Sequence, residues 1–122
     1  MPLHRYRKPR VNHPFVGTWH ITEMELWDED YLDMERQAFL AIRPDGSGEF
    51  QFGLVRGIVD GYVDGEPPEQ TFAFTWDGSD EMDPVSGSGW MRLRSTDEVR
   101  GLIKIHLADR STFTARRVGG RG

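Results

Sequence analysis

Hydrophobic and polar residues alternate over much of the chain. Phe50 and Phe52 alternate with Glu49 and Gln51, which places both rings on one face of a strand. The same period of two recurs at Phe72, Phe74 and Trp76, and at Val99, Ile103, Ile105 and Leu107. Turn-forming clusters separate these segments: Asp45-Gly46-Ser47-Gly48, Asp64-Gly65-Glu66-Pro67-Pro68, Asp77-Gly78-Ser79 and Thr96-Asp97-Glu98. Short strands divided by turns about every ten residues are typical of an antiparallel sandwich or barrel.

The pattern predicts eight strands and one short helix in a single domain. The strands are expected over residues 16–27, 37–43, 48–55, 57–64, 69–77, 87–95, 98–108 and 112–118. The helix is expected over residues 28–35, because Asp28, Glu29 and Asp30 suit the positive end of a helix dipole. A meander of antiparallel strands leaves two open edges unless it closes, so we predict an all-β, up-and-down barrel.

The side-chain period also predicts how two hairpins pair, because a slip of one residue would turn a whole apolar face outward. A three-residue turn over residues 109–111 brings the apolar residues of both flanking strands to one face. It aligns Ile103, Ile105 and Leu107 with Phe113, Ala115 and Arg117. By the same reasoning, a turn over residues 45–47 sets Leu40 and Ile42 beside Phe52 and Phe50.

The first strand changes parity along its length. Trp19 and Ile21 share one parity, whereas Met24 and Leu26 share the other. A β-bulge at residue 22 or 23 would bring all four side chains to the same face.

Composition narrows the class of protein. The chain has 122 residues, of which 37% are hydrophobic, with 14 glycines and no cysteine. We therefore expect one folded domain without disulfides, thiol chemistry or a cysteine-bound zinc. Apolar runs such as Phe39 to Ile42 are far shorter than the ~20 residues of a membrane-spanning helix. With no secretory signal visible, we expect a cytoplasmic protein that does not enter the membrane.

Charge is unevenly distributed along the chain. Residues 14–115 contain all 20 acidic residues but 8 of the 15 basic ones, a net charge of −12. We expect no nucleic-acid binding, because binding to phosphates depends on cations that displace counterions. The remaining basic residues lie near the termini. Residues 1–13 and 119–122 are predicted to be flexible tails on a barrel domain that spans residues 14–118.

Both ends of the predicted barrel carry a familiar pattern. Gly17-Thr18-Trp19 begins the first strand, and Arg117 falls on the core face of the last strand. This pattern resembles the G-x-W start and late arginine of the lipocalins and the wider calycin superfamily. The resemblance implies that Gly17, Trp19 and Arg117 close one barrel end, with Arg116 as the alternative arginine. Residues 76–83 and 106–113 also resemble segments of short bacterial proteins of uncharacterised function.

A small eight-stranded barrel is either filled by side chains or leaves room for one small ligand. The first hypothesis is that this protein binds an apolar or amphipathic small molecule in its interior. We assign the pocket walls to the aromatic residues Phe72, Phe74, Trp76 and Trp90. Polar groups for the ligand would come from Glu23, Glu25, Arg92 and Arg94 if their side chains point inward.

The second hypothesis is an enzyme with an acid/base cluster at one barrel end. Its candidate residues are Glu81, His106 and Asp109, because histidine titrates near neutral pH. Residues 77–83 imitate the start of a calcium loop, but Met82 stands where glycine makes the turn and Ser88 where a glutamate belongs. We therefore expect no metal ion and no other cofactor.

The third hypothesis is a solidly packed barrel that binds a protein partner through an exposed apolar patch. A homodimer is an alternative that the sequence leaves open. An internal cavity would favour the first hypothesis, and a cavity opening onto His106 or Glu81 would favour the second. A filled interior with an exposed apolar patch would favour the third.

Overall fold

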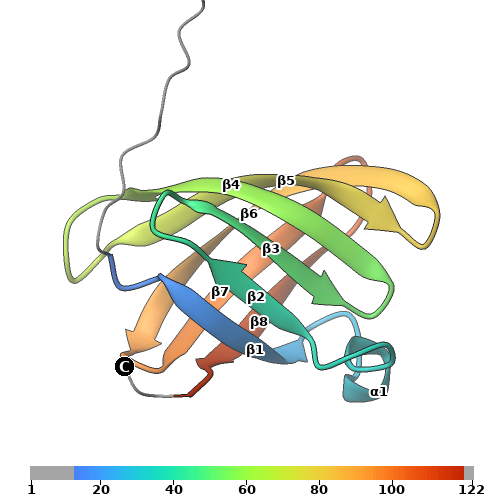
Figure 1. The fold of residues 1–122 in the computed structure, drawn as a ribbon, viewed down its shortest axis with the longest axis horizontal. Coiled ribbons are helices and arrows are strands. Elements are labelled where there is room, and N and C mark those ends of the chain that lie inside the picture. Colours follow the sequence, from blue (N-terminus) through green and yellow to red (C-terminus); the bar gives the residue numbers. More distant parts are fainter. Residues whose placement is uncertain (1–12, 120–122) are drawn as a thin grey trace, which may run out of the picture.

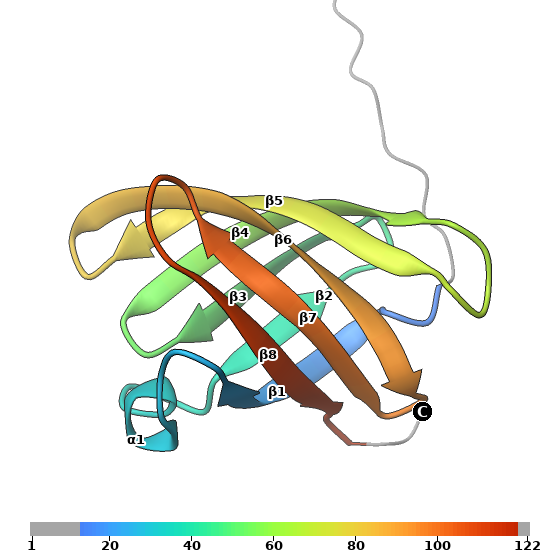
Figure 2. The same ribbon diagram turned by 180° about the vertical axis from the view of Figure 1, so that it is seen from behind.

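The computed structural model of the protein describes residues 13–119, so the predicted tails lie almost entirely outside the described residues. Within residues 13–119, eight antiparallel strands form one closed up-and-down barrel (Figures 1 and 2). The strands are β1 (Gly17–Met24), β2 (Phe39–Ile42), β3 (Ser47–Phe52), β4 (Val55–Asp64), β5 (Thr71–Asp80), β6 (Asp83–Ser95), β7 (Glu98–Ile105) and β8 (Arg110–Arg117). With one short helix after β1, α1 (Glu29–Leu32), the predicted fold class is confirmed.

The predicted bulge in β1 is present. Pairing between β1 and β8 shifts between Ile21 and Glu23, so that Thr22 is the extra residue. As a result Trp19, Ile21 and Met24 are all buried despite their different parities. Leu26 stays exposed because it lies beyond the end of β1.

The hairpin from β2 to β3 is shifted by two residues from the predicted register, although the inner face is the expected one. Leu40 pairs with Phe50, and Ile42 pairs with Gly48. The three-residue turn is formed by residues 44–46, not 45–47. Gly46 has a φ of +89°, and its N–H donates to the carbonyl of Arg43 at 2.9 Å. A three-residue hairpin needs a left-handed residue at its third position, and Gly46 fills it when the turn starts at residue 44.

The predicted register of the hairpin from β7 to β8 is wrong by six residues, because the turn is longer and lies earlier in the chain than residues 109–111. Gly101 pairs with Phe113, and Ile103 pairs with Ser111. The predicted inward position of Leu107 is wrong, because Leu107 lies in the turn with a φ of +62° and is 89% exposed. The N–H of Ile105 donates to the carbonyl of Asp109 at 2.8 Å and so closes the turn. Because β7 ends at Ile105, the alternation of inward and outward side chains stops before Leu107.

The acidic segment at residues 77–83 is mostly strand, whereas the sequence predicted a loop. It continues β5 to Asp80 and starts β6 at Asp83, with Glu81 and Met82 as the turn. Gly78 pairs with Gly57 of β4. The N–H of Glu81 also donates to the carbonyl of Leu54 at 3.1 Å. Residues 77–80 are therefore strand despite their turn-forming composition, because they pair with β4.

The helix α1 closes one end of the barrel. The Asp28 carboxylate accepts a hydrogen bond from the N–H of Tyr31 at 3.1 Å, so Asp28 is the N-cap. Leu32 is buried under the barrel rim. The ring of Tyr31 lies against Gly53, and its hydroxyl accepts from the N–H of Leu54 at 3.2 Å. These contacts fix a helix of a single turn, which its own propensity would not stabilise.

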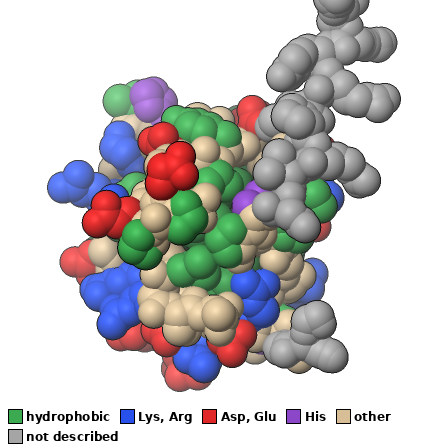
Figure 3. Space-filling model, turned by 90° about the vertical axis from the view of Figure 1, so that its left-hand side faces the viewer, with side chains coloured by type: hydrophobic (Ala, Val, Ile, Leu, Met, Phe, Trp, Pro, Cys, Tyr) green, Lys and Arg blue, Asp and Glu red, His purple; other side chains and the backbone are tan. Residues whose placement is uncertain are grey.

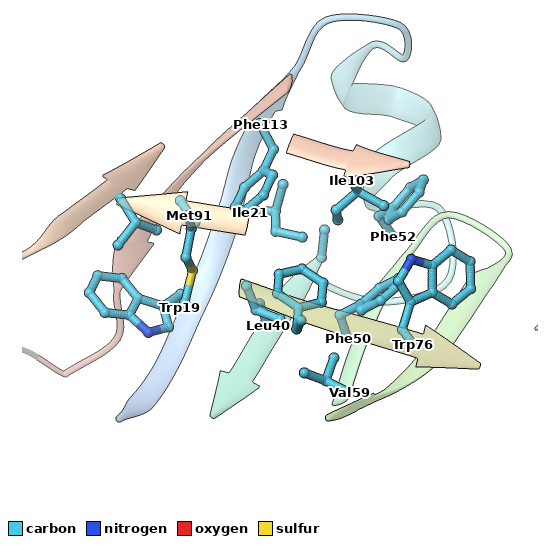
Figure 4. Close-up of a cluster of buried hydrophobic side chains, with 14 of the residues drawn as sticks. Trp19, Ile21, Leu40, Phe50, Phe52, Val59, Trp76, Met91, Ile103 and Phe113 are labelled. Atoms are coloured by element: carbon cyan, nitrogen blue, oxygen red, sulfur yellow. The ribbon is translucent and has the colours of Figure 1, made fainter. Parts of the chain in front are cut away.

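The barrel interior is filled by aromatic and aliphatic side chains. Figure 4 shows Phe50 and Trp76 pointing toward the same centre, and their ring centroids are 5.0 Å apart in an edge-to-face arrangement. Inward-facing glycines make room for the rings: a Cβ on Gly57 would lie 2.6 Å from the Phe50 ring, and one on Gly61 would lie 2.6 Å from the Phe72 ring. The interior is therefore packed to the density of a protein core at these positions.

Candidate functional site

The four residues assigned to an interior pocket are divided between the two faces of the sheet. Phe72, Phe74 and Trp76 point into the packed interior. The predicted inward position of Trp90 is wrong. Trp90 lies on the outer face of β6, is 38% exposed, and has the Arg92 guanidinium 5.6 Å from a ring centroid. The inward position is taken by its neighbour Met91, because successive residues of a strand face opposite sides.

A groove of about 510 Å³ lies on the outer face where β4, β5 and β6 run side by side. Its floor is formed by the cross-strand row Gly61, Phe74 and Gly89, in which Phe74 has a glycine on each side. This row faces the barrel interior, so on the outer face it lies as a floor between the two outward-facing rows on either side. Phe74 lines the groove although it is only 4% exposed and lies on the inner face of β5.

The two walls of this groove, which we call the outer groove, differ in chemistry. One wall presents a carboxylate and two hydroxyls, from Asp60, Thr75 and Ser88. The other wall is formed by Tyr62 and Ala73, and Trp90 pairs with Ala73 and continues it. Side chains two residues apart on a strand lie about 7 Å apart, so one molecule can touch both walls. The outer groove therefore suits a small amphipathic ligand.

Large hydrophobic side chains reach the surface on these strands. Tyr62 is 62% exposed and Ile58 is 64% exposed, both on the outer face of β4. Figure 3, a view of the left-hand side of Figure 1, shows hydrophobic side chains gathered in the centre of that face, with acidic and basic side chains around them. An apolar patch with a polar rim is typical of a binding surface.

Comparisons of the chain with protein-family models, with curated proteins and with solved structures found no match. The outer groove must be interpreted from its own chemistry. In the part of the chain that the structure describes, no helix is both long enough and apolar enough to cross a membrane.

The predicted acid/base residues lie in two different turns of the barrel. Glu81 lies in the β5–β6 turn and lines a hollow of about 330 Å³ that neither His106 nor Asp109 lines. His106 and Asp109 are exposed in the β7–β8 turn, where the backbone N–H of His106 donates to the carbonyl of Ser86 at 2.7 Å. Within residues 13–119, no group of three or more His, Asp or Glu side chains is arranged to hold a metal ion.

The four charged residues considered for an interior ligand all point outward. Glu23, Glu25, Arg92 and Arg94 are exposed. All but Arg92 line a hollow of about 420 Å³ on the outer face beside β1, β7 and β8. The Nε of Arg92 instead donates to the hydroxyl of Thr71 at 2.9 Å. None of the four supplies a polar group to the barrel interior.

The second barrel end is closed by the residues before β1. The Trp19 indole N–H donates to the carbonyl of Phe15 at 3.0 Å, and both side chains are fully buried. The Arg117 guanidinium lies 4.2 Å from a Trp19 ring centroid, so the contact that the family resemblance implies is present. Arg117 also donates from Nη1 to the carbonyl of Val16 at 2.9 Å and from Nη2 to the carbonyl of Pro14 at 2.9 Å. Arg117 thus ties the chain before β1 to the last strand.

Gly17 is placed where a side chain would disturb this contact. Its φ is +131°, and a Cβ at this position would lie 3.0 Å from Nη1 of Arg117. Glycine therefore allows both the backbone conformation and the close approach of the guanidinium.

His13, which the sequence placed in the N-terminal tail, packs on the barrel end. Its ring is stacked with Phe72, with 5.9 Å between ring centroids. Its Nδ1 accepts a hydrogen bond from the N–H of Phe15 at 3.2 Å, which requires an unprotonated Nδ1. Desolvation by burial lowers the pKa of His13 below its ordinary value of 6.5.

We expect the free energy of unfolding to fall as the pH drops below 6.5 through the lowered pKa of His13. Between the lowered pKa of His13 and 6.5, the unfolded state binds a proton more readily than the folded state, so the free energy of unfolding rises with pH. The contribution of the unprotonated His13 to stability is fully present above pH 6.5. Chemical denaturation at several pH values would measure this. His13→Phe keeps a ring on Phe72 and should flatten the dependence, whereas His106→Gln, in an exposed turn, should leave the contribution of His13 in place. A wild-type profile that matches that of His13→Phe would contradict the prediction.

Sequence reasoning missed Tyr62 and the two glycines of the groove floor. The alternation of Asp60 and Tyr62 with Gly61 was visible in the sequence and places both polar-tipped side chains on the outer face of β4. The parity of Trp90 against Met91 and Leu93 was a second indication. Aromatic residues were assigned to the core by type, and parity would have placed Trp90 outside.

Proposed function

We propose that this protein is a non-catalytic binding barrel of calycin-like fold that takes a small amphipathic molecule in the outer groove. The main support for this proposal is that the open space large enough for a ligand lies outside the barrel wall. The described interior is packed with rings against Gly57 and Gly61, whereas the outer groove of about 510 Å³ lies outside the sheet. Ligand pockets for small molecules have volumes of roughly 300–1,000 Å³.

Two features support the calycin-like assignment. The barrel is a closed up-and-down meander, which is consistent with that fold. Trp19 near the start of β1 is covered by Arg117 near the end of β8, as the resemblance implies. In this proposal the Trp19–Arg117 pair is structural, and the ligand binds at a different place from the barrel interior.

A catalytic role has less support than binding. Glu81, His106 and Asp109 are exposed, and the hollow that Glu81 lines is not lined by His106 or Asp109. General acid/base catalysis requires groups within hydrogen-bond reach of one substrate position. A cytoplasmic location stays a prediction from the sequence.

The proposal is tested by mapping where small amphipathic molecules bind to the full chain. A fragment library is added to ¹⁵N-labelled protein, and chemical shifts of backbone amides and tryptophan indoles are followed. We expect the shifts to concentrate on Tyr62, Ala73, Thr75 and the Trp90 indole, and to disappear in Trp90→Ala. As a matched control, Leu107→Ala removes an exposed side chain of another surface and should leave binding unchanged. Shifts confined to the buried Trp76 indole and its neighbours would show that ligands enter the interior and would overturn the proposal.

A further inference from the structure

We infer that two copies of this chain form a dimer by packing the outer faces of β4, β5, β6 and β7 against each other, and that the partner's Trp90 enters the outer groove. We call this surface the four-strand face. The inference goes beyond the proposed function and does not require a small ligand to bind. A two-fold dimer needs a surface that is complementary to itself, and the four-strand face meets this requirement in both its shape and its charge.

An apolar row crosses the middle of the four-strand face. The strands β4 to β7 run side by side in the barrel wall (Figure 2). Their registers place four side chains next to one another across these strands: Tyr62, Ala73, Trp90 and Leu102. The Tyr62 and Trp90 rings are exposed, and Leu102 is half-buried. Because Ala73 is much smaller than its neighbours, the row has a hollow on β5 beside a large ring on β6.

The charges beside this row are divided between the two halves of the face. On β4 they are acidic, from Asp60 and Asp64. On β6 and β7 they are basic, from Arg92, Arg100 and Lys104. Asp60 already interacts within its own chain, whereas neither Asp64 nor Arg100 takes part in an ion pair within residues 13–119. The face is therefore negative along one edge and positive along the other.

A two-fold axis along the strands, between β5 and β6, brings the opposite charges together. It lays β4 of one copy over β7 of its partner, with each cross-strand row over the same row. Asp64 and Arg100 lie in one row, because Asp64 pairs with Thr71, Arg92 donates to the Thr71 hydroxyl at 2.9 Å, and Arg92 pairs with Arg100. Asp64 of each copy then faces the partner's Arg100, so this ion pair forms twice. Sheets that pack face to face keep their strands within about 30° of each other, which such an axis allows.

The same axis fills the outer groove. It lays β5 of one copy over β6 of its partner, so that the partner's Trp90 lies over Ala73, which lines the groove. Tyr62 then faces the partner's Leu102. Tryptophan is enriched at the centres of protein interfaces, where it fills a pocket on the other subunit. An indole and a small ligand would use the same space, so the two compete for the groove.

The size of the four-strand face sets the strength of the dimer. With strands about 4.8 Å apart and alternate side chains about 7 Å apart, three rows on four strands span about 14 Å in each direction. A contact of this extent falls short of the roughly 1,200–2,000 Å² that standard interfaces bury in total. We therefore expect a reversible dimer with a micromolar dissociation constant.

Charge reversal tests the pairing of the two copies. In Asp64→Arg and in Arg100→Asp, like charges meet twice in each dimer, so either variant alone should associate at least about tenfold more weakly than the wild-type chain. An equimolar mixture of the two variants should regain the wild-type dissociation constant, because opposite charges then meet at both contacts. Sedimentation velocity of the full chain from micromolar to millimolar concentration at low salt measures these constants. Asp30→Arg, which reverses an exposed acid of α1, is the matched control and should associate as the wild type does.

Three results would overturn the inference. The first is a wild-type chain that stays monomeric up to millimolar concentration, which leaves the proposed function standing. The second is a dimer that neither reversal weakens, or variants whose mixture stays monomeric, because the copies then do not meet through Asp64 and Arg100. The third is loss of self-association when the basic residues near the N-terminus are replaced by serine, which identifies that segment as the occupant: Arg5, Arg7, Lys8 and Arg10.

Competition separates this inference from the proposed function. A fragment that binds in the outer groove should raise the dissociation constant of the dimer, because it displaces the partner's Trp90. A bound fragment that leaves this constant unchanged overturns the placement of Trp90 in the groove. If the two variants restore each other in the mixture but no fragment binds the groove, the dimer stands and the proposed function is overturned.

Discussion

Replacing Trp19 with alanine is expected to lower the free energy of unfolding by about 3–5 kcal/mol, the range for deleting a large buried aromatic side chain. Trp19 has no exposed surface, and the Arg117 guanidinium packs against it, 4.2 Å from a centroid of the indole ring. Without the ring, the indole bond to the Phe15 carbonyl is lost and the guanidinium loses its packing partner. The loss of stability should therefore extend to the segment before β1, because Arg117 donates hydrogen bonds to the carbonyls of Pro14 and Val16 there.

Urea denaturation of Trp19→Ala and of the wild-type chain measures this loss. Trp90→Ala is the matched control, because it deletes the same side chain at a partly exposed position on the outer face. We expect the control to lose well under half as much stability, since a partly exposed ring gives up less buried area on deletion. A Trp19→Ala loss no larger than that of Trp90→Ala would show that the barrel end does not depend on this residue.

Replacing Phe50 with alanine is expected to cost about 3–5 kcal/mol and to create a dry cavity that binds benzene. Phe50 is 1% exposed, lies 5.0 Å from Trp76 between ring centroids, and fills the space above Gly57. The wild-type interior has a ring at this position, so benzene should not raise the melting temperature of the wild-type chain. In Phe50→Ala, ligand binding to the folded state alone should raise it.

Thermal unfolding with and without saturating benzene checks both parts of this expectation. Ile58→Ala serves as the control, because Ile58 lies on the outer face of β4, is 64% exposed and leaves no enclosed space when truncated. Stabilisation of the wild-type chain by benzene to the same extent as Phe50→Ala would mean that the interior is hollow. It would then favour an interior ligand over the outer groove.

Much of the fold follows from the alternation of side chains. Phe50 and Phe52, and likewise Phe72, Phe74 and Trp76, lie on the inner face as their period of two requires. The parity change between Ile21 and Met24 predicted the bulge that β1 contains. These predictions succeed because a strand has only two faces, and burial of the apolar one strongly disfavours a slip of one residue.

Turn positions were predicted less well, because a slip of two residues preserves the face. The β2–β3 hairpin is shifted by two residues, and Leu107 is displaced from the inner face to the exposed β7–β8 turn. In both hairpins, the choice depends on backbone hydrogen bonds such as those of Gly46 and Ile105, which side-chain parity does not describe. Residues 77–80 are strand for the same reason, since pairing with β4 outweighs their turn-forming composition.

The sequence by itself determined an antiparallel meander and most of its inner face, because period and parity act locally along each strand. The contact of Trp19 with an arginine of the last strand was implied by the family resemblance, and parity favoured Arg117 over Arg116. Only the tertiary structure decided whether the barrel is filled and where a ligand has room. That depends on glycines of one strand facing rings of the next, such as Gly57 with Phe50 and Gly61 with Phe72. It also depends on the register that sets the inward-facing row Gly61, Phe74 and Gly89 beneath the outer groove. Both features arise from registers between strands, and a register is fixed by the packing of the whole barrel.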